Sequence, residues 1–283
     1  MNILTIHKPR ALFTYIKYLV IMIVAIIFAS PLYISFIFSM KTQSDMGTRS
    51  PLALPESLYL GNYIDVITRN KAFQIGLVNS VLTTIPIVIL LTVLCSMAAY
   101  VLARNNKKVH SFIYYIFLAG ILIPFQCIMF PTYVNLKSIG LMNTLIGFVI
   151  VRTGFQIAIC ILILTNFIKT VPLEVEEAAN IDGASHFQTF WQVVFPLMKP
   201  INVTMIILNT LFAWNDFYVS LTILQQNAKR TLPLAQFVYI SEAGVDINTA
   251  FAFFTLCMLP VLILYLFAQK YIVSGIMSGA VKG

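Results

Sequence analysis

The chain has 283 residues, of which 59% are hydrophobic and only 10% are charged, whereas soluble proteins carry about a quarter charged residues. The apolar residues come in blocks of about twenty or more, which is the length that a helix needs to cross roughly 30 Å of hydrocarbon. A soluble domain is therefore excluded, and so is a membrane β-barrel, which would show shorter alternating segments. The sequence predicts an all-α, polytopic membrane protein with a single transmembrane domain over residues 1–283.

The formal net charge of +8 does not indicate a nucleic-acid partner. Lysine and arginine are spread over short loops that flank the apolar blocks, and no basic run is long enough to follow a phosphate backbone. The cysteines lack the C-x-x-C spacing of a metal or redox site, and all of them fall in apolar blocks. We interpret them as small buried side chains: Cys95, Cys127, Cys160 and Cys257.

Six apolar stretches predict six transmembrane spans, the first of which is too long for a signal peptide and is interpreted as retained. Several prolines fall inside these spans, where each removes a backbone hydrogen bond and predicts a kink. These prolines are Pro31, Pro86, Pro124, Pro131 and Pro260. The spans lie at about residues 13–40, 73–103, 111–135, 143–168, 201–224 and 248–273.

The basic residues predict which side of the membrane each loop faces. If the N-terminus lies inside, the inner segments carry more lysine and arginine than the outer ones, and the short basic loop at residues 104–110 is also inside. Both termini and residues 171–200 are then cytoplasmic. The two long loops at residues 41–72 and 225–247 lie outside. Two interpretations of these loops are equally favoured, one as surfaces that bind a partner and the other as solvated lids.

Signatures of catalysis are absent from the sequence. The chain has no G-x-x-x-x-G-K-[ST] loop for ATP phosphates, no H-E-x-x-H metal motif and no G-x-S-x-G nucleophile elbow. We therefore expect no enzyme activity, no catalytic residue, no metal site and no cofactor in this chain. The protein is expected to move or anchor something.

Residues 171–200 stand out because they hold four of the ten acidic residues between two apolar stretches. Acidic side chains favour the positive end of a helix dipole, so a helix is predicted up to Asp182, with Gly183 as a left-handed stop. A second helix is predicted from apolar residues at i, i+3, i+4 and i+7, and Pro196 and Pro200 are expected to end it. This apolar stripe consists of Phe187, Phe190, Trp191 and Val194.

The first of these two helices is short and acidic, and its alanine pair offers little side-chain bulk. Helices that lie on lipid usually carry lysine and arginine on their polar face, whereas acidic side chains are repelled by anionic headgroups. A protein partner is therefore favoured over a hairpin lying on the lipid surface.

The spacing in this loop resembles the E-A-A-x-x-x-G-x9-I-x-L-P signature of permease subunits of bacterial ATP-binding-cassette importers. Glu177-Ala178-Ala179 is followed by Gly183 and, nine residues later, by Val193-Val194-Phe195-Pro196, with conservative replacements of the isoleucine and leucine. Other segments resemble the carbohydrate-uptake branch, the MalG-like subunits: Glu176 before the signature, Ile181-Asp182-Gly183-Ala184, Asn62-Tyr63, Asn79-Ser80, Trp214-Asn215-Asp216-Phe217, Thr231-Leu232-Pro233 and the tail from Gly275 to Gly283.

The resemblance implies a permease in the plasma or inner membrane of a bacterium that forms the path for a sugar or oligosaccharide. It implies a cytoplasmic ATPase dimer, which would bind ATP and Mg. A second permease, usually in a heterodimer, an extracytoplasmic binding protein at residues 225–247 and membrane lipid are the other implied partners. The resemblance also implies which residues couple the permease to this ATPase: Glu176, Glu177, Ala178, Ala179, Asp182 and Gly183. The tail residues Lys282 and Gly283 would reach the same ATPase.

Polar residues inside the fifth span are candidates for the substrate path. Asp216 lies roughly 13 Å of helix inside the expected outer end of this span, and intramembrane carboxylates normally face a cavity or a partner. Asp216 and Asn215 either face the path or form a polar clamp between helices. Trp214 and Tyr218 offer faces for sugar rings.

The fourth span adds Arg152, with Gln156 one turn further on. Arg152 either lines the path or snorkels to the outer interface, and snorkelling is the interpretation that we favour.

The competing function is that of a secondary transporter coupled to an ion gradient. Such a protein is expected to show inverted repeats and broken helices around a midplane site. No repeated half is visible in the sequence, and the single asymmetric helical loop also argues against it. The sequence does not name the sugar.

Overall fold

The computed structural model describes residues 9–48, 50, 52–241 and 246–280, with side chains described from residue 13 to residue 269 of these. All regular elements in this part of the chain are helices. The chain divides into two compact units, one made of residues 1–69 and 242–256 and the other of residues 70–241 and 257–283. Each unit is considered by itself. Lys282 and Gly283, the expected tail contacts, lie outside the described residues.

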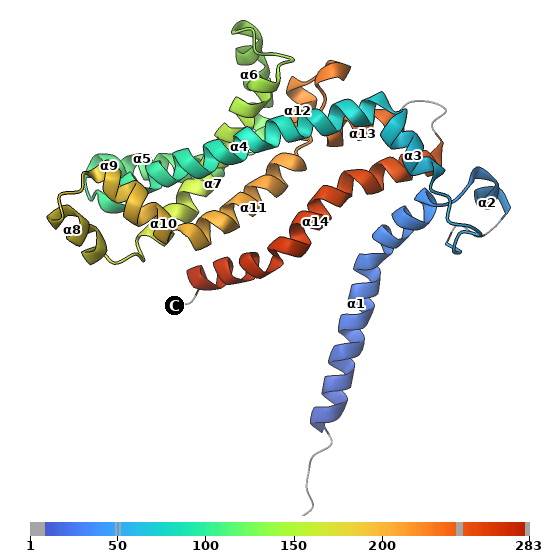
Figure 1. The fold of residues 1–283 in the computed structure, drawn as a ribbon, viewed down its shortest axis with the longest axis horizontal. Coiled ribbons are helices and arrows are strands. Elements are labelled where there is room, and N and C mark those ends of the chain that lie inside the picture. The colour runs from blue at the N-terminus through green and yellow to red at the C-terminus, as the bar shows by residue number, and fades with distance from the viewer. Residues whose placement is uncertain (1–8, 49, 51, 242–245, 281–283) are drawn as a thin grey trace, which may run out of the picture. The chain divides into compact units, whose positions relative to one another are not determined.

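The first unit contains one long apolar helix, two short helices and the start of α14 (Figure 1): α1 (Pro9–Ser39), α2 (Gln43–Thr48), α3 (Gly61–Thr68) and the first residues of α14 (Ile247–Ala280). Residues 13–33 of α1 are exposed along their whole length, as suits a helix surrounded by lipid. The chain after α1 is fixed by the side-chain amides of Asn62 and Asn248, which both donate hydrogen bonds to the carbonyl of Lys41, at 3.0 and 2.8 Å.

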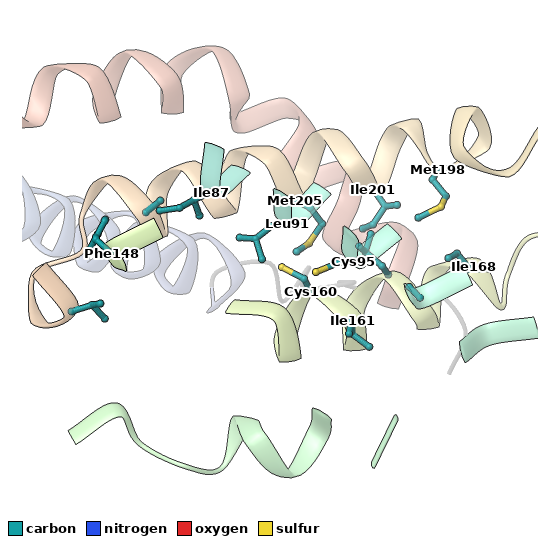
Figure 2. Close-up of a cluster of buried hydrophobic side chains, with 14 of the residues drawn as sticks. Ile87, Leu91, Cys95, Phe148, Cys160, Ile161, Ile168, Met198, Ile201 and Met205 are labelled. Carbon is teal, nitrogen blue, oxygen red and sulfur yellow. The ribbon is translucent and has the colours of Figure 1, made fainter. Parts of the chain in front are cut away.

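The core of the second unit is formed by α4 (Lys71–Arg104), α7 (Leu145–Ile168) and α11 (Lys199–Trp214). Side chains cap the N-termini of two of these helices: Asn70 accepts a hydrogen bond from the Phe73 N–H, and Thr144 accepts one from the Gly147 N–H. Apolar side chains from all three helices meet in one cluster (Figure 2). The cluster includes Ile87, Leu91 and Cys95 of α4, Phe148, Cys160, Ile161 and Ile168 of α7, and Ile201 and Met205 of α11.

The stretch expected as a single third span, residues 111–135, consists of two helices. They are α5 (Lys108–Ile121) and α6 (Phe125–Ser138), and their axes differ by 103°. Proline accounts for the break, because Pro124 disfavours a helical conformation at the residue before it and lies at the N-cap of α6. The sequence predicted a kink here, and the structure shows a full change of direction.

The stretch expected as the fifth span is also interrupted. Helix α11 ends at Trp214, residues 215–217 are not helical, and α12 (Tyr218–Ile223) follows. At its start, α11 is bent by 76° from the helical segment His186–Leu197. Pro196 and Pro200 lie in the first turns of α10 (Phe195–Leu197) and α11, where proline is tolerated, and the expected end of the second helix falls between them, after Leu197.

The remaining elements are η2 (Asn227–Lys229), α13 (Leu232–Ser241) and α14 (Ile247–Ala280), which holds the expected sixth span. Four described helices are long and apolar enough to cross a membrane, and there are up to six spans if each bent pair crosses as one. The expected number of six is reached if α5–α6 crosses as one span and the segment His186–Leu197 crosses together with α11.

Candidate functional sites

The loop at residues 171–200 forms the helix–turn–helix that the sequence predicts. Helix α8 (Glu174–Ile181) carries three acidic residues in its first turn, and Gly183 follows with a φ of +87°, a left-handed conformation that glycine adopts without strain. Helix α9 (His186–Thr189) then begins with a capping box between Ser185 and Gln188. It continues through a π-helical stretch, η1 (Phe190–Val194), into α10.

A buried ion pair attaches this helix–turn–helix to α4. Glu176 accepts hydrogen bonds from the Arg104 Nε, at 2.8 Å, and from the Tyr100 hydroxyl, at 3.0 Å. The Arg104 Nη2 lies 2.7 Å from the same carboxylate and also donates to the Val171 carbonyl at 2.9 Å. The Glu176 and Arg104 side chains are only 7% and 14% exposed, so the pair lies in a poorly solvated contact where such bonds are strong.

The other predicted coupling residues face outward. Glu177, Ala178, Asp182 and Gly183 are exposed, and Ala179 is half-buried. The apolar stripe expected on the second helix is buried at Phe190 and Val194 and half-buried at Trp191, but Phe187 departs from it and is 65% exposed. Ile181 is 86% exposed. The exposed residues of this loop thus include two apolar side chains, Ile181 and Phe187, and two acidic ones. We call this set of residues the loop face: Glu177, Ala178, Ile181, Asp182, Gly183 and Phe187.

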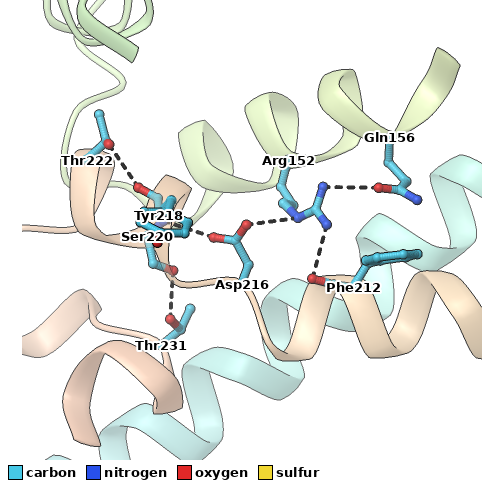
Figure 3. Close-up of polar contacts among 8 residues, drawn as sticks. All are labelled: Arg152, Gln156, Phe212, Asp216, Tyr218, Ser220, Thr222 and Thr231. Carbon is cyan, nitrogen blue, oxygen red and sulfur yellow. Dashed lines mark hydrogen bonds and ion pairs between the residues drawn. The ribbon is translucent and has the colours of Figure 1, made fainter. Parts of the chain in front are cut away.

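A second polar site lies where α11 breaks. Arg152 of α7 forms an ion pair with Asp216, with 3.1 Å between the Arg152 Nε and the Asp216 Oδ2 (Figure 3). Its other nitrogens donate to the Gln156 Oε1 at 3.3 Å and to the Phe212 carbonyl at 3.1 Å. Asp216 in turn accepts from the Ser220 N–H, at 3.1 Å, at the start of α12.

This geometry corrects the preferred interpretation of Arg152. The residue is only 8% exposed, and its guanidinium points to Asp216 and to the end of α11. It therefore does not snorkel. Its charge is compensated by Asp216, which makes the pair a polar clamp between α7 and the 215–217 break, as buried intramembrane charges require.

Four of the six path candidates line one pocket of about 340 Å³ beside this clamp. Arg152 and Gln156 contribute from α7, and Asp216 and Tyr218 contribute from the α11–α12 break. Aromatic side chains complete the wall, including Phe125, Phe155 and Phe212. The other two candidates do not line this pocket: Trp214 is buried and donates from its Nε1 to the Cys257 carbonyl at 3.4 Å, and Asn215 is exposed.

Sequence reasoning missed several of these contacts. It did not assign Tyr100 or Arg104 to the site. Arg104 is nevertheless the last residue of a long apolar block, on the same predicted side of the membrane as the acidic stretch at residues 171–200. Sequence reasoning also treated Arg152 and Asp216 separately. Two opposite charges within neighbouring apolar spans are a signal for pairing and would have joined them.

Comparison with known proteins identifies the family to which this chain belongs. The family described as "Binding-protein-dependent transport system inner membrane component" matches residues 74–278. The chain is 33% identical to the multiple sugar-binding transport system permease protein MsmG of Streptococcus mutans, over 94% of this chain and 96% of the relative. It is 31% identical to the melibiose/raffinose/stachyose import permease protein MelC of Bacillus subtilis, over 89% of this chain and 91% of the relative.

A solved structure has the same fold. It is the crystal structure of a bacterial ABC transporter involved in the import of the acidic polysaccharide alginate. The TM-score is 0.82 at 21% sequence identity, and the match covers 95% of this chain and 99% of that chain.

Proposed function

The chain belongs to the family of inner membrane components of binding-protein-dependent transport systems, and we propose that it is a permease subunit of an ATP-driven carbohydrate importer. The observation that carries the proposal is the loop face, which is held on α4 by the Arg104–Glu176 pair. The relatives MsmG and MelC, named as sugar transport permeases, support a carbohydrate as the substrate. In this role the chain catalyses no reaction itself.

The loop face suits a partner that converts chemical energy into movement. The Ile181 and Phe187 side chains are 86% and 65% exposed, and exposed apolar side chains that gather in one segment mark interaction surfaces. We assign this surface to a cytoplasmic ATPase dimer, which would bind ATP and Mg. Glu177, Asp182 and Gly183 would meet the ATPase, whereas Glu176 would hold the helix in place from inside.

The remaining partners follow from the same proposal. A second permease would complete the transmembrane path as a heterodimer, and an extracytoplasmic binding protein would dock on the opposite side at residues 225–247. Both termini would be cytoplasmic in a bacterial plasma or inner membrane. The tail residues Lys282 and Gly283 would lie near the ATPase.

The pocket beside the clamp is the proposed place of sugar contact in this chain. Its volume of about 340 Å³ falls within the range of about 300–1,000 Å³ typical of small-molecule sites. Sugars present apolar ring faces and hydroxyl groups, and the pocket offers aromatic walls together with the Gln156 amide and the Asp216 carboxylate. Trp214, which is buried, and Asn215 would support this site from the end of α11.

Replacement of Gly183 by valine tests the coupling assignment. A Cβ at Gly183 meets no atom within 4 Å, so valine strains only the backbone at a φ of +87°. Gly140 offers a matched control, because its φ is +71° and its surroundings are equally open. The complete transporter in proteoliposomes should lose most sugar uptake with Gly183→Val while ATP hydrolysis continues, and Gly140→Val should transport normally.

The same assay decides between the two function classes. Uptake that requires ATP and the ATPase subunit supports the proposed importer. Uptake by Gly183→Val at the wild-type rate, with ATP consumed normally, would reject the coupling assignment. Uptake driven by a proton or sodium gradient without ATP would establish a secondary transporter instead.

A further inference from the structure

Helix α4 holds a different chain segment at each of its two ends. Figure 1 shows it running from the end where α8 and α9 lie to the end where α13 lies, all within the second unit. At the first end, Tyr100 and Arg104 bind Glu176 of the helix–turn–helix at residues 171–200, which we call the coupling loop. The opposite end binds the segment at residues 227–241, which we call the outer segment.

The contacts with the outer segment are made to its backbone. The Asn79 side-chain amide donates to the carbonyls of Ala228, at 3.1 Å, and Arg230, at 3.0 Å. The Ser80 hydroxyl accepts from the Leu232 N–H at 2.8 Å. Asn79 is 6% exposed and Ser80 is 1% exposed. These bonds therefore fix the position of the outer segment whatever side chains it carries.

The outer segment also packs very closely on α4. A Cβ added at Gly76 would lie 3.1 Å from the Leu232 Cα and 3.1 Å from the Ala235 Cβ. These distances are shorter than most Cβ contacts, so even a methyl group at this position would push against the start of α13, which packs closely on the α4 backbone. Movement of the outer segment without movement of α4 would break buried hydrogen bonds and this packing.

Between its ends α4 is continuous and firmly packed. The 21 helical steps from Asn79 to Tyr100 correspond to about 32 Å of helix, and the helix passes through Pro86 without interruption. Its middle is embedded in the core, where Ile87, Leu91 and Cys95 are each 1% exposed. Packed helices in such cores transmit displacement because the interior has little free volume.

We propose that α4 is a strut that transmits binding at the outer segment to the coupling loop, with Asn79 and Ser80 as positioning residues at one end and Tyr100 and Arg104 at the other. The proposal rests on the proposed function, because it requires a binding protein on one side and an ATPase on the other. It adds the route by which the arrival of the binding protein changes ATP hydrolysis, and it assigns four residues to that route.

The test measures ATP hydrolysis by the complete transporter in nanodiscs, with and without purified binding protein. Asn79→Ala and Ser80→Ala remove the outer contacts and leave the coupling loop unchanged. Coupling between sites typically amounts to factors of about 5 to 150, so stimulation should fall at least about fivefold in these variants. Basal hydrolysis and the affinity for the binding protein should stay within about twofold of wild type.

Ser96→Ala is the matched control. Ser96 lies on the same helix, is 0% exposed and donates one hydrogen bond to Asn202 at 3.2 Å, but it binds neither end segment. It should therefore keep full stimulation. The strut is rejected if Asn79→Ala and Ser80→Ala are stimulated normally, if they lose affinity in parallel, or if Ser96→Ala loses as much. A wild-type complex that no binding protein stimulates would reject the proposed function itself.

Discussion

The continuous helices α4 and α7 differ from the broken pairs α5–α6 and α11–α12 in what they contribute. The continuous helices supply nine of the 20 buried side chains in the apolar core, more than the broken pairs supply, and α4 carries the coupling loop. The broken pairs supply the ends that frame the pocket beside the clamp, including Phe125 at the start of α6 and Asp216 between α11 and α12. In the second unit, uninterrupted helices give rigidity, whereas breaks place polar groups and freed backbone around a pocket.

The comparison also bears on the competing function. Broken helices are a feature expected of secondary transporters, and the described residues contain two sharply bent helix pairs, α5–α6 and the segment His186–Leu197 with α11. They are nevertheless compatible with the family to which the chain belongs, so a break by itself does not distinguish the two mechanisms. Irregular backbone within a membrane is tolerated wherever it lines a cavity or is covered by protein.

The largest effect is expected at the clamp that joins continuous α7 to the break after α11. Arg152→Met leaves the Asp216 carboxylate buried without its partner, and such losses cost about 3–5 kcal/mol. The thermal unfolding midpoint in detergent should fall sharply. Adding Asp216→Leu should recover much of the loss, because a buried pair replaced by apolar residues is often close to neutral.

An exposed ion pair provides the control for this prediction. Arg69 and Asp65 lie 2.9 Å apart, but their side chains are 81% and 40% exposed, and exposed pairs contribute little. Arg69→Met should therefore leave the midpoint almost unchanged. Equal shifts for Arg152→Met and Arg69→Met would show that the clamp has no special role.

A smaller effect is expected where α4 holds the coupling loop. Glu176→Ala leaves the Arg104 Nε and the Tyr100 hydroxyl without their acceptor, while the Arg104 Nη2 keeps the Val171 carbonyl, so the local cost is about 1–3 kcal/mol. Amide hydrogen exchange in residues 174–181 should become faster. Glu177→Ala, one residue away and exposed, should leave this exchange unchanged but weaken copurification with the ATPase. The assignment would be contradicted if Glu177→Ala, and not Glu176→Ala, made the exchange faster, or if Glu176→Ala alone weakened copurification without changing the exchange.

The smallest effect is expected at the pocket wall. Tyr218→Ala removes one aromatic face, and aromatic contacts of this kind are worth about 0.5–1.5 kcal/mol, or about twofold to tenfold in uptake. Phe130→Ala is a suitable control because Phe130 is 74% exposed on α6 and does not line the pocket. Initial uptake rates should fall for the first variant alone, and equal rates would remove Tyr218 from the path.

Much of this organisation could be predicted from the sequence. Hydropathy locates α4, α7 and α14 to within a few residues, because long apolar helices have a strong signal. The helix–turn–helix was predicted from the acidic first turn, Gly183 and the apolar stripe. Hydropathy did not predict the breaks at Pro124 and after Trp214, because the residues on both sides of each break remain apolar.

The side-chain pairings were harder to predict. Arg104 and Glu176 are separated by 72 positions, and only the fold brings them together. The direction of Glu176 also depends on the rotation of α8, which turns this residue inward and its neighbour Glu177 outward. Sequence therefore indicated which loop is important and left open which of its residues hold it and which are available to a partner.

Cross-linking from the loop face tests the central assignment most directly. A cysteine at Ile181, in a chain with Cys127→Ser to remove the exposed native thiol, should cross-link to the ATPase subunit of the purified transporter. A cysteine at Ile139, which is 64% exposed at the end of α6, should not. Failure of the Ile181 cysteine to reach the ATPase in a transporter that still imports sugar, or cross-linking from Ile139 instead, would contradict the assignment.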